Sequence, residues 1–227
     1  MGPVANLGPG RPRIAQRLRR GGTPRAEILD AAGELFTTNG YANTSTRVIA
    51  DAVGIRQASL YHHFAAKDDI LDALLAETVT TPLELAVRLD AVKESAPTRL
   101  YALASFDVRQ LCAARWNLGA LYLLPEVRTA RFATFRLRRD ELRRHYEALA
   151  AAVLAEVGGA GITDAQALPF RLVEMVIGIR SDEGVAPAAA ERTIPDAALR
   201  VLGWPGDLDA LRTAAHQLLE RLEPPAA

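Results

Sequence analysis

The sequence predicts an all-α protein with an N-terminal domain of three helices and a larger helical C-terminal domain. Apolar residues recur at helical spacing along most of the 227 residues, and no segment sustains the alternation typical of a β-strand. Two very short helices joined by a glycine turn follow the first helix, which is the helix-turn-helix pattern. With 49% hydrophobic and 24% charged residues, the composition is that of a soluble globular protein.

Composition also disfavours several classes of protein. No apolar run approaches about 18 residues, so no membrane-spanning helix is expected. The N-terminus lacks the apolar stretch of a secretory signal. Cys112 is the only cysteine, so no disulfide can form within one chain, which suits the cytosol. We therefore expect a cytoplasmic protein without a membrane partner.

The first segment differs from the rest of the chain. Residues 1–22 are rich in glycine, proline and arginine and are expected to form a flexible basic arm. Within it, GPGRPR at 8–13 is similar to arginine hooks that enter the minor groove of DNA. A solvated tail that adds only electrostatic attraction explains this composition equally well, so both interpretations stay open.

Residues 23–68 predict the three-helix domain. The dipeptide TP at 23–24 supplies an N-cap and a first-turn proline, and NG at 39–40 ends the first helix. The tripeptide TST at 44–46 begins the second helix, and Gly54 makes the turn. The third helix spans about residues 56–62, with Leu60 and Phe64 as anchors.

Residues 69–227 predict a regulatory and dimerisation domain made of helices alone. The spacing of apolar residues predicts helices over 67–80, 97–113, 115–122, 125–157, 164–183, 194–202 and 207–222. A continuation of the first of these past Pro82 to about residue 93 is left open. Proline and glycine clusters separate the others.

Charge is unevenly distributed although the chain is neutral overall. Residues 1–67 hold nine basic and four acidic side chains, 9 − 4 = +5, so residues 68–227 carry −5. A basic N-terminal unit on an acidic body suggests a polyanion that binds at one end only.

The third helix concentrates hydrogen-bonding groups. In the stretch IRQASLYHHF, residues 55–64, the only large apolar anchors are Ile55, Leu60 and Phe64. The second helix of a helix-turn-helix lies in the major groove and offers its N-terminal residues to base edges. Polar side chains on the outer face are therefore explained if this helix reads DNA.

Individual residue types suit this role. Gln57 can form two hydrogen bonds to adenine, Ser59 can contact either base type, and Arg56 can bind guanine or a phosphate. Candidates for phosphate contact are Thr46, Arg47, Tyr61, His62, His63 and Lys67, three of them at helix starts. A metal site at His62 and His63 is disfavoured because adjacent residues point to different faces of a helix.

The run from Arg25 to about Leu75 resembles the DNA-binding domain of the tetracycline-repressor (TetR) family. Four linked submotifs carry the resemblance: ILDAA..LF...G, T..R.IA...G, the short helix ending LY.HF, and K.D.L. All four occur at the right spacings, which makes the match specific. The helical remainder fits the family without being diagnostic of it.

The resemblance implies a homodimer that addresses an inverted repeat, and a small-molecule pocket whose filling releases DNA. Carried over by position, the DNA contacts are Thr46, Arg47, Gln57, Ala58, Ser59, Tyr61, His62, His63 and Lys67. Ala58 departs from the glycine or proline that is common there. Its methyl group can instead meet a thymine methyl.

The ligand pocket should be largely apolar with a few polar groups. Candidates are Tyr101, Phe106, Cys112, Trp116, Asn117, Tyr122, Phe135, Phe170 and Glu174, although most of them suit a plain core as well. Arg171 and Glu174 lie in an otherwise apolar helix and need partners. A ligand, each other at i,i+3, or a second copy of the chain would supply them.

Two further surfaces bear on partners. The arginine-rich helix 125–149 carries interleaved acids, which favours pairs along a solvated face over a second nucleic-acid patch. Helices 164–183 and 207–222 carry more apolar surface than one small domain can easily cover, so packing against their copies is expected in a twofold dimer.

The sequence thus predicts a ligand-released, DNA-binding transcriptional regulator, with repression favoured. An enzyme is the rival class, but no phosphate loop, HExxH motif, nucleophile elbow or Cys–His pair is present. No catalytic residue, metal or cofactor is therefore expected, and Glu174 is the least unsuitable acid. A DNA-coating protein with the same fold is the second rival, and its affinity would follow salt instead of sequence.

Overall fold

The computed structural model describes residues 22–159 and 163–222. Over those residues it consists of α-helices and 3-10 helices without a β-strand, which confirms the all-α class. The predicted arm lies outside the described residues except for Gly22. Within the described part, no helix is both long and apolar enough to span a bilayer.

The N-terminal helices follow the predicted capping signals. They are α1 (Pro24–Thr38), α2 (Thr46–Val53), α3 (Gln57–Tyr61) and α4 (Lys67–Asp90). The side chain of Thr23 accepts a hydrogen bond from the Ala26 amide at 3.2 Å, and that of Ser45 accepts one from the Val48 amide at 3.3 Å. Gly54 ends α2 with φ of +73°, in the left-handed region where glycine is favoured.

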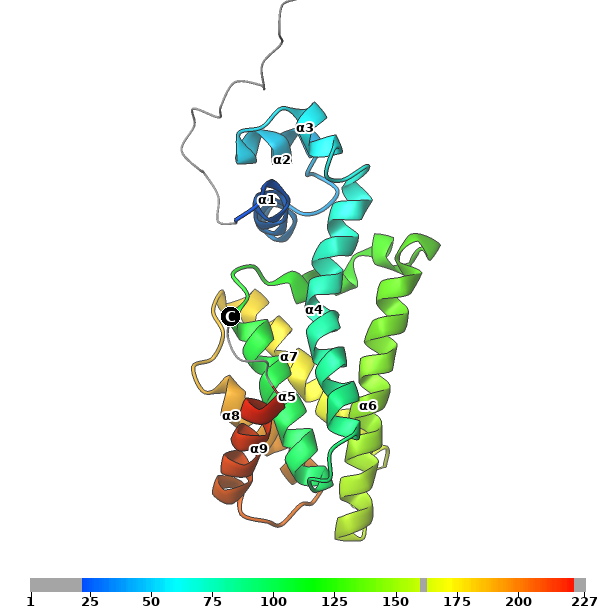
Figure 1. The fold of residues 1–227 in the computed structure, drawn as a ribbon, viewed down its shortest axis with the longest axis vertical. Helices are drawn as coiled ribbons and strands as arrows, with labels where there is room; N and C mark the ends of the chain where they lie inside the picture. Colours follow the sequence, from blue (N-terminus) through cyan, green and yellow to red (C-terminus); the bar gives the residue numbers. More distant parts are fainter. Residues whose placement is uncertain (1–21, 160–162, 223–227) are drawn as a thin grey trace, which may run out of the picture.

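The remaining elements form an elongated bundle below this domain (Figure 1). They are α5 (Ala96–Ala113), η1 (Leu118–Leu123), η2 (Pro125–Arg128), η3 (Ala130–Phe132), α6 (Ala133–Val157), η4 (Ala165–Ala167), α7 (Leu168–Glu183), α8 (Ala190–Val201) and α9 (Leu208–Leu222). In the figure, α4 runs from the upper domain down into the bundle, alongside α5, α6 and α7.

Helix α4 passes through Pro82 without interruption, which settles the continuation that the sequence left open. A proline has no amide hydrogen to donate to the carbonyl four residues earlier, here that of Thr78. The Gln110 side chain of α5 donates to this carbonyl at 3.3 Å and to the Glu77 carbonyl at 3.2 Å. A side chain from a neighbouring helix thus satisfies the group that the proline leaves unpaired.

Several predicted boundaries differ from the structure. Segment 115–122 and the first part of 125–157 form short 3-10 helices, so the long helix there begins only at Ala133. The helix predicted over 194–202 begins four residues earlier, at Ala190, and includes Pro195. Pro195 is the sixth residue of this helix and has no amide hydrogen to donate to the carbonyl four residues earlier.

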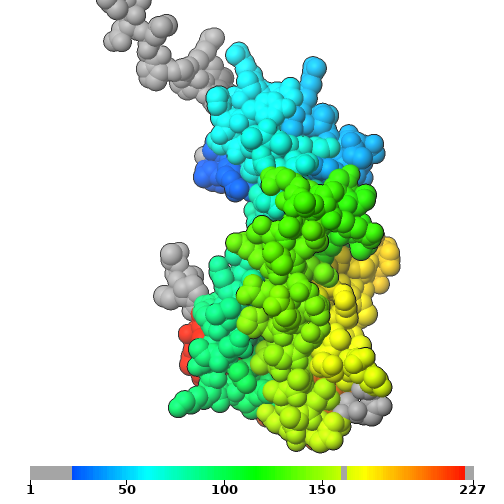
Figure 2. All heavy atoms as spheres, turned by 90° about the vertical axis from the view of Figure 1, so that its right-hand side faces the viewer, coloured from blue at the N-terminus to red at the C-terminus, as the bar shows by residue number. Residues whose placement is uncertain are grey.

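Two clusters of buried side chains hold the molecule together. One joins α1–α3 and the first half of α4 to Leu121, Val127, Phe132 and Phe135. The other joins the second half of α4 to α5–α9. Figure 2 shows the green segment from η1 to the start of α6 directly beneath the cyan upper domain. The first cluster therefore extends beyond residue 68, into residues from the C-terminal part of the chain.

The apolar stripe of α9 is covered within one chain. Leu211, Ala215, Leu218 and Leu219 are each at most 6% exposed and belong to the same cluster as α5. The sequence argument that this face needs a second copy to cover it is therefore wrong for α9. On α7, by contrast, Met175 remains 50% exposed.

Candidate functional site

The outer face of α3 forms a polar surface at the upper end of the molecule. Arg56, Gln57, Ala58, Ser59, Tyr61, His62 and His63 are all exposed, while Leu60 is fully buried. Arg47 at the start of α2 is exposed as well, and Thr46 is partly buried. The structure thus gathers nine of the ten predicted DNA contacts on α2, α3 and the turn that follows.

Three of these residues form a hydrogen-bonded network. The Gln57 side-chain amide donates to the Thr46 hydroxyl at 2.9 Å and to the Tyr61 hydroxyl at 3.5 Å. The hydroxyls of Thr46 and Tyr61 lie 3.1 Å apart. The network joins the first residue of α2 to both ends of α3. It orients the Gln57 amide before any partner binds, which lowers the entropy cost of recognition.

Lys67, the tenth predicted contact, is partly buried and already engaged. Its ammonium donates to the Tyr41 carbonyl at 2.9 Å and lies 4.1 Å from the centroid of the Tyr41 ring. The Tyr41 hydroxyl in turn donates to Asp68. An ammonium group has three N–H donors, so Lys67 can bind a phosphate while it holds the start of α4 against Tyr41.

The centre of the C-terminal bundle contains a buried polar cluster in place of an open pocket. Asp107 of α5 accepts a hydrogen bond from the Tyr146 hydroxyl of α6 at 3.1 Å, and Tyr122 donates to Thr78 at 2.6 Å. The cavity between these groups has a volume of about 10 Å³, which is no more than one water molecule requires.

The ionisation of Asp107 is strongly perturbed. Burial raises the pKa of this carboxyl from 3.8 to about 7; the Tyr146 hydrogen bond lowers it, and the Glu174 carboxylate raises it further. Burial also raises the pKa of Tyr146 and of Tyr122. The Asp107 carboxyl, which lies where α5 meets α6, therefore has a pKa near neutral pH.

Glu174 of α7 binds two arginines. The Arg139 guanidinium donates to both of its carboxylate oxygens, from Nε at 2.8 Å and from Nη2 at 2.6 Å. Arg171, three residues earlier on α7, places its Nη1 atom 3.6 Å from Glu174 Oε2. Of the partners that the sequence left open for Glu174, the structure supplies Arg171, and it adds Arg139 from α6.

The nine predicted pocket residues are dispersed. Tyr122, Phe170 and Glu174 line the small central cavity. Tyr101 donates to Asp196 of α8, Asn117 donates to α7, and Trp116 contacts α1. Phe135 belongs to the upper core cluster, and Phe106 and Cys112 lie at the edge of the lower one. The structure therefore brings only three of the nine together around one cavity.

Sequence reasoning missed Asp107, Tyr146 and Arg139 as central residues. A signal for Asp107 was present. It occupies an inward position of helix 97–113, three and four residues from Leu103, Ala104 and Leu111, all of which are buried. An acid on an apolar stripe indicates a buried, partnered carboxyl. Arg139 gave no such signal because it stands among other arginines on a polar helix.

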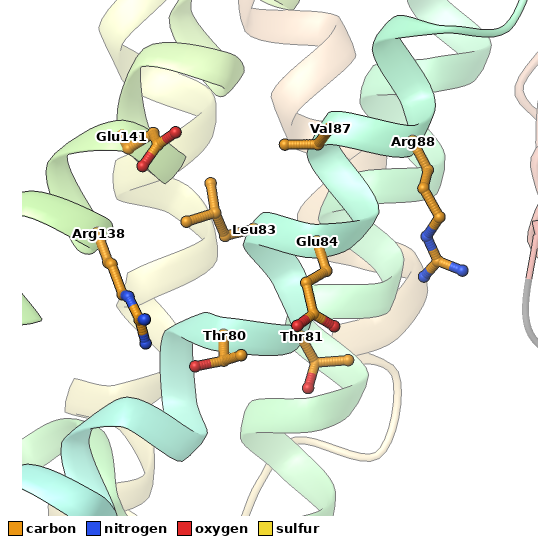
Figure 3. Close-up of a pocket in the computed structure, with 8 residues that line it drawn as sticks. All are labelled: Thr80, Thr81, Leu83, Glu84, Val87, Arg88, Arg138 and Glu141. Atoms are coloured by element: carbon orange, nitrogen blue, oxygen red, sulfur yellow. The ribbon is translucent and has the colours of Figure 1, made fainter.

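A larger hollow lies on the outside of the bundle, between α4 and α6. This groove of about 700 Å³ is lined by Thr80, Thr81, Leu83, Glu84, Val87, Arg88, Arg138 and Glu141 (Figure 3). In the figure, Arg138 points along the groove toward Thr80, whereas Arg88 points to the opposite side of α4. There Arg88 donates to the Leu222 carbonyl of α9 at 2.5 Å.

Two arginines of 125–149 pair with acids of their own helix. Arg143 binds Asp140 and Glu147 at 2.5 and 2.6 Å, and Arg144 lies 3.4 Å from Asp140. Arg136 donates to the Val127 and Thr129 carbonyls instead of joining the expected row with Asp140. These pairs support the interpretation of a solvated, internally compensated face.

A helix-turn-helix domain with an exposed polar third helix, carried on a helical bundle, defines a DNA-binding regulator. The family model described as bacterial regulatory proteins, tetR family, matches residues 28–74. The crystal structure of Mycobacterium smegmatis AmtR is 61% identical, with a TM-score of 0.87 over 92% of this chain and 100% of that one. The chain therefore belongs to the TetR family of transcriptional regulators, a family of DNA-binding proteins and not of enzymes.

Curated relatives match over the N-terminal domain. The transcriptional repressor KstR2 of Mycobacterium tuberculosis is 47% identical over 51 residues, which are 22% of this chain and 26% of KstR2. The regulator UidR of Escherichia coli is 36% identical over 53 residues, which are 23% of this chain and 27% of UidR. These alignments thus span about a quarter of each relative's length.

Proposed function

We propose that the protein is a cytoplasmic repressor that binds an inverted-repeat operator as a homodimer and is released by a small-molecule effector. The observation that carries the proposal is the outer face of α3. It offers a run of exposed hydrogen-bonding side chains over a buried anchor, and the Gln57 amide is held in place. Such a face suits base edges in the major groove.

Repression is favoured over activation by the names of relatives. KstR2 is a transcriptional repressor, although its similarity to this chain is confined to the DNA-binding domain. A repressor needs no contact beyond its operator, because occupancy alone excludes other proteins from the DNA.

Dimerisation is proposed through α7. Support comes from α7, where Met175 is half exposed and a side chain at Gly178 would meet only open space. One short helix reads only a few base pairs. Two such helices held about 34–36 Å apart read two half-sites one helical turn apart, which gives the specificity that a single α3 lacks.

Effector release is proposed to act on the centre of the bundle. The cavity there is too small for an effector, so binding requires α5, α6 and α7 to separate, which would shift α4 and the attached α3. The coupling is an equilibrium one, and operator must therefore weaken effector binding by the same factor by which effector weakens operator binding.

Selection of bound fragments from the organism's genomic DNA tests the proposal. We expect purified protein at about 150 mM salt to enrich an inverted repeat that it binds roughly a thousandfold or more tightly than a scrambled duplex of equal length. A protein that only coats DNA would show affinity that falls with salt and ignores sequence. Equal affinity for both duplexes would overturn the proposal.

A further inference from the structure

The segment after α5, including the first two residues of η1, joins the DNA-binding domain to the bundle at a point separate from α4. We define the strap as residues 114–119, ARWNLG. The first connection is α4, which is continuous from one part to the other. Residues of η1, η2, η3 and α6 also pack in the upper core cluster. The strap differs from them because its side chains form hydrogen bonds with both α1 and α7.

On one side, the strap forms hydrogen bonds with α1. The Arg115 guanidinium donates to both carboxylate oxygens of Asp30 at 3.0 Å, and the Trp116 indole N–H donates to Asp30 Oδ1 at 3.1 Å. Asp30 is only 13% exposed in its side chain, so this charge is largely removed from water. At Gly33, a Cβ atom would lie 2.9 Å from the Trp116 ring, which indicates close contact with α1.

On the other side, the strap forms hydrogen bonds with α7. The Asn117 side-chain amide donates to the Ile177 carbonyl and to the Ser181 hydroxyl, both at 2.9 Å. At Gly119, a Cβ atom would lie 2.5 Å from the Ile177 side chain, so the backbone of the strap approaches α7 closely. Arg180 of α7 also donates to the Ala114 carbonyl at 2.6 Å.

The strap packs on both core clusters, and open clefts lie beside it. Leu118 packs on the upper core cluster, and Ile177 packs on the lower one, so the strap connects the two clusters. Clefts of about 400 and 340 Å³ adjoin it, and Trp116 lines the first while Asn117 lines the second. These clefts leave the strap room to follow a movement of α7.

We propose that Asp30, Arg115, Trp116 and Asn117 are positioning residues for operator binding. They link α1 to α7 through the strap and set the orientation of α3 relative to the bundle. They do not touch DNA; they determine whether the two α3 helices of a dimer meet both half-sites at once. The inference rests on the dimeric operator binding proposed above, and it adds a route from α7 that does not run through α4.

Two variants break the strap at opposite ends, and their effect is read on three DNA duplexes. Asp30→Leu removes the acceptor on α1, and Asn117→Ala removes the donor to α7. The duplexes are the selected inverted repeat, the same repeat with its spacer changed by one base pair, and a single half-site. Asp30→Asn retains a carbonyl oxygen that accepts from Trp116, and Asp182→Asn is an exposed control on α7.

We expect both strap-breaking variants to bind the inverted repeat about 5- to 150-fold more weakly, the range typical of coupling between sites. Their affinity for the single half-site should stay within about twofold of the parent, and their preference for the native spacer should shrink. Asp30→Asn should restore most of the affinity, and the control should match the parent.

Other outcomes overturn the inference. Equal losses on the inverted repeat and the half-site would mean that the substitutions merely damage the DNA-binding domain. Unchanged affinities in both variants would mean that the strap does not set the orientation of α3. If the parent protein itself prefers the inverted repeat no more than the half-site, dimeric operator binding fails, and this result is distinct from a failure of the strap.

Discussion

Asp107→Asn is expected to remove a pH dependence of stability between about pH 4 and pH 7. Burial raises the pKa of Asp107 from 3.8 to about 7 in the folded protein. Between these values the unfolded chain has released the proton and the folded chain has kept it. The folded state therefore binds more protons, and the free energy of unfolding falls as pH rises, by up to about 1.4 kcal/mol per pH unit.

The sign of this change of stability with pH distinguishes Asp107 from an ion-paired carboxyl. A carboxyl whose pKa is lowered, as Arg143 lowers that of Asp140, contributes stability that is lost as pH falls. The contribution of Asp107 is present at acid pH and is lost as pH rises toward 7. Between pH 3.8 and about pH 7, the contribution of Asp107 to the free energy of unfolding falls by about 4 kcal/mol at most.

Urea denaturation of the parent and the Asp107→Asn variant at several pH values between 4.5 and 7.5 measures this effect. The stability of the variant relative to the parent should increase with pH, whatever its absolute value, because only the parent has a carboxyl that titrates at this position. Asparagine can still accept the Tyr146 hydrogen bond. The exposed Asp182→Asn variant should run parallel to the parent. Parallel curves for Asp107→Asn would contradict the account.

Arg139→Met is expected to lower the free energy of unfolding by about 2–3 kcal/mol. The substitution leaves the Glu174 carboxylate, whose side chain is 16% exposed, without its two-point partner. Breaking a buried pair typically costs about 3–5 kcal/mol; the value here is lower because the Arg139 side chain keeps 29% exposure and Arg171 lies nearby. The guanidinium also lies 5.3 Å from the ring centroids of both Tyr122 and Phe170.

A double-mutant cycle identifies the cause. Glu174→Leu removes the carboxylate, so Arg139→Met should cost much less in that background, since no charge is stranded. If Arg139→Met cost the same with and without Glu174, the loss would come from packing against the aromatic rings, and the ion pair would not be the stabilising feature of the centre.

Local signals predicted the N-terminal domain closely. The cap at Thr23, the turn at Gly54 and the anchor Leu60 each depend on only a few neighbouring residues, which short motifs encode. The exposed face of α3 follows directly, because Leu60 is the single buried residue of this five-residue helix.

The centre of the bundle was not predictable in the same way. Whether Phe135 packs on the upper or the lower cluster depends on where α6 begins, and the 3-10 segments before it moved that start to Ala133. Likewise, Glu174 meets Arg139 only because α6 and α7 lie side by side, and their residues are 35 positions apart. Pairings at that separation depend on the packing of whole helices, which residue spacing within one helix does not specify.

The central claim is that α3 reads base sequence, and substitution of Gln57 on the selected operator tests it most directly. The affinities of the parent and Gln57→Ala are compared on the operator, on operators changed at each base pair, and on a scrambled duplex. We expect the variant to lose about 1–3 kcal/mol of discrimination at one symmetric base pair of each half-site, with unchanged affinity for the scrambled duplex. An equal loss on operator and scrambled duplex, or no loss on either, would show that α3 does not read sequence through Gln57.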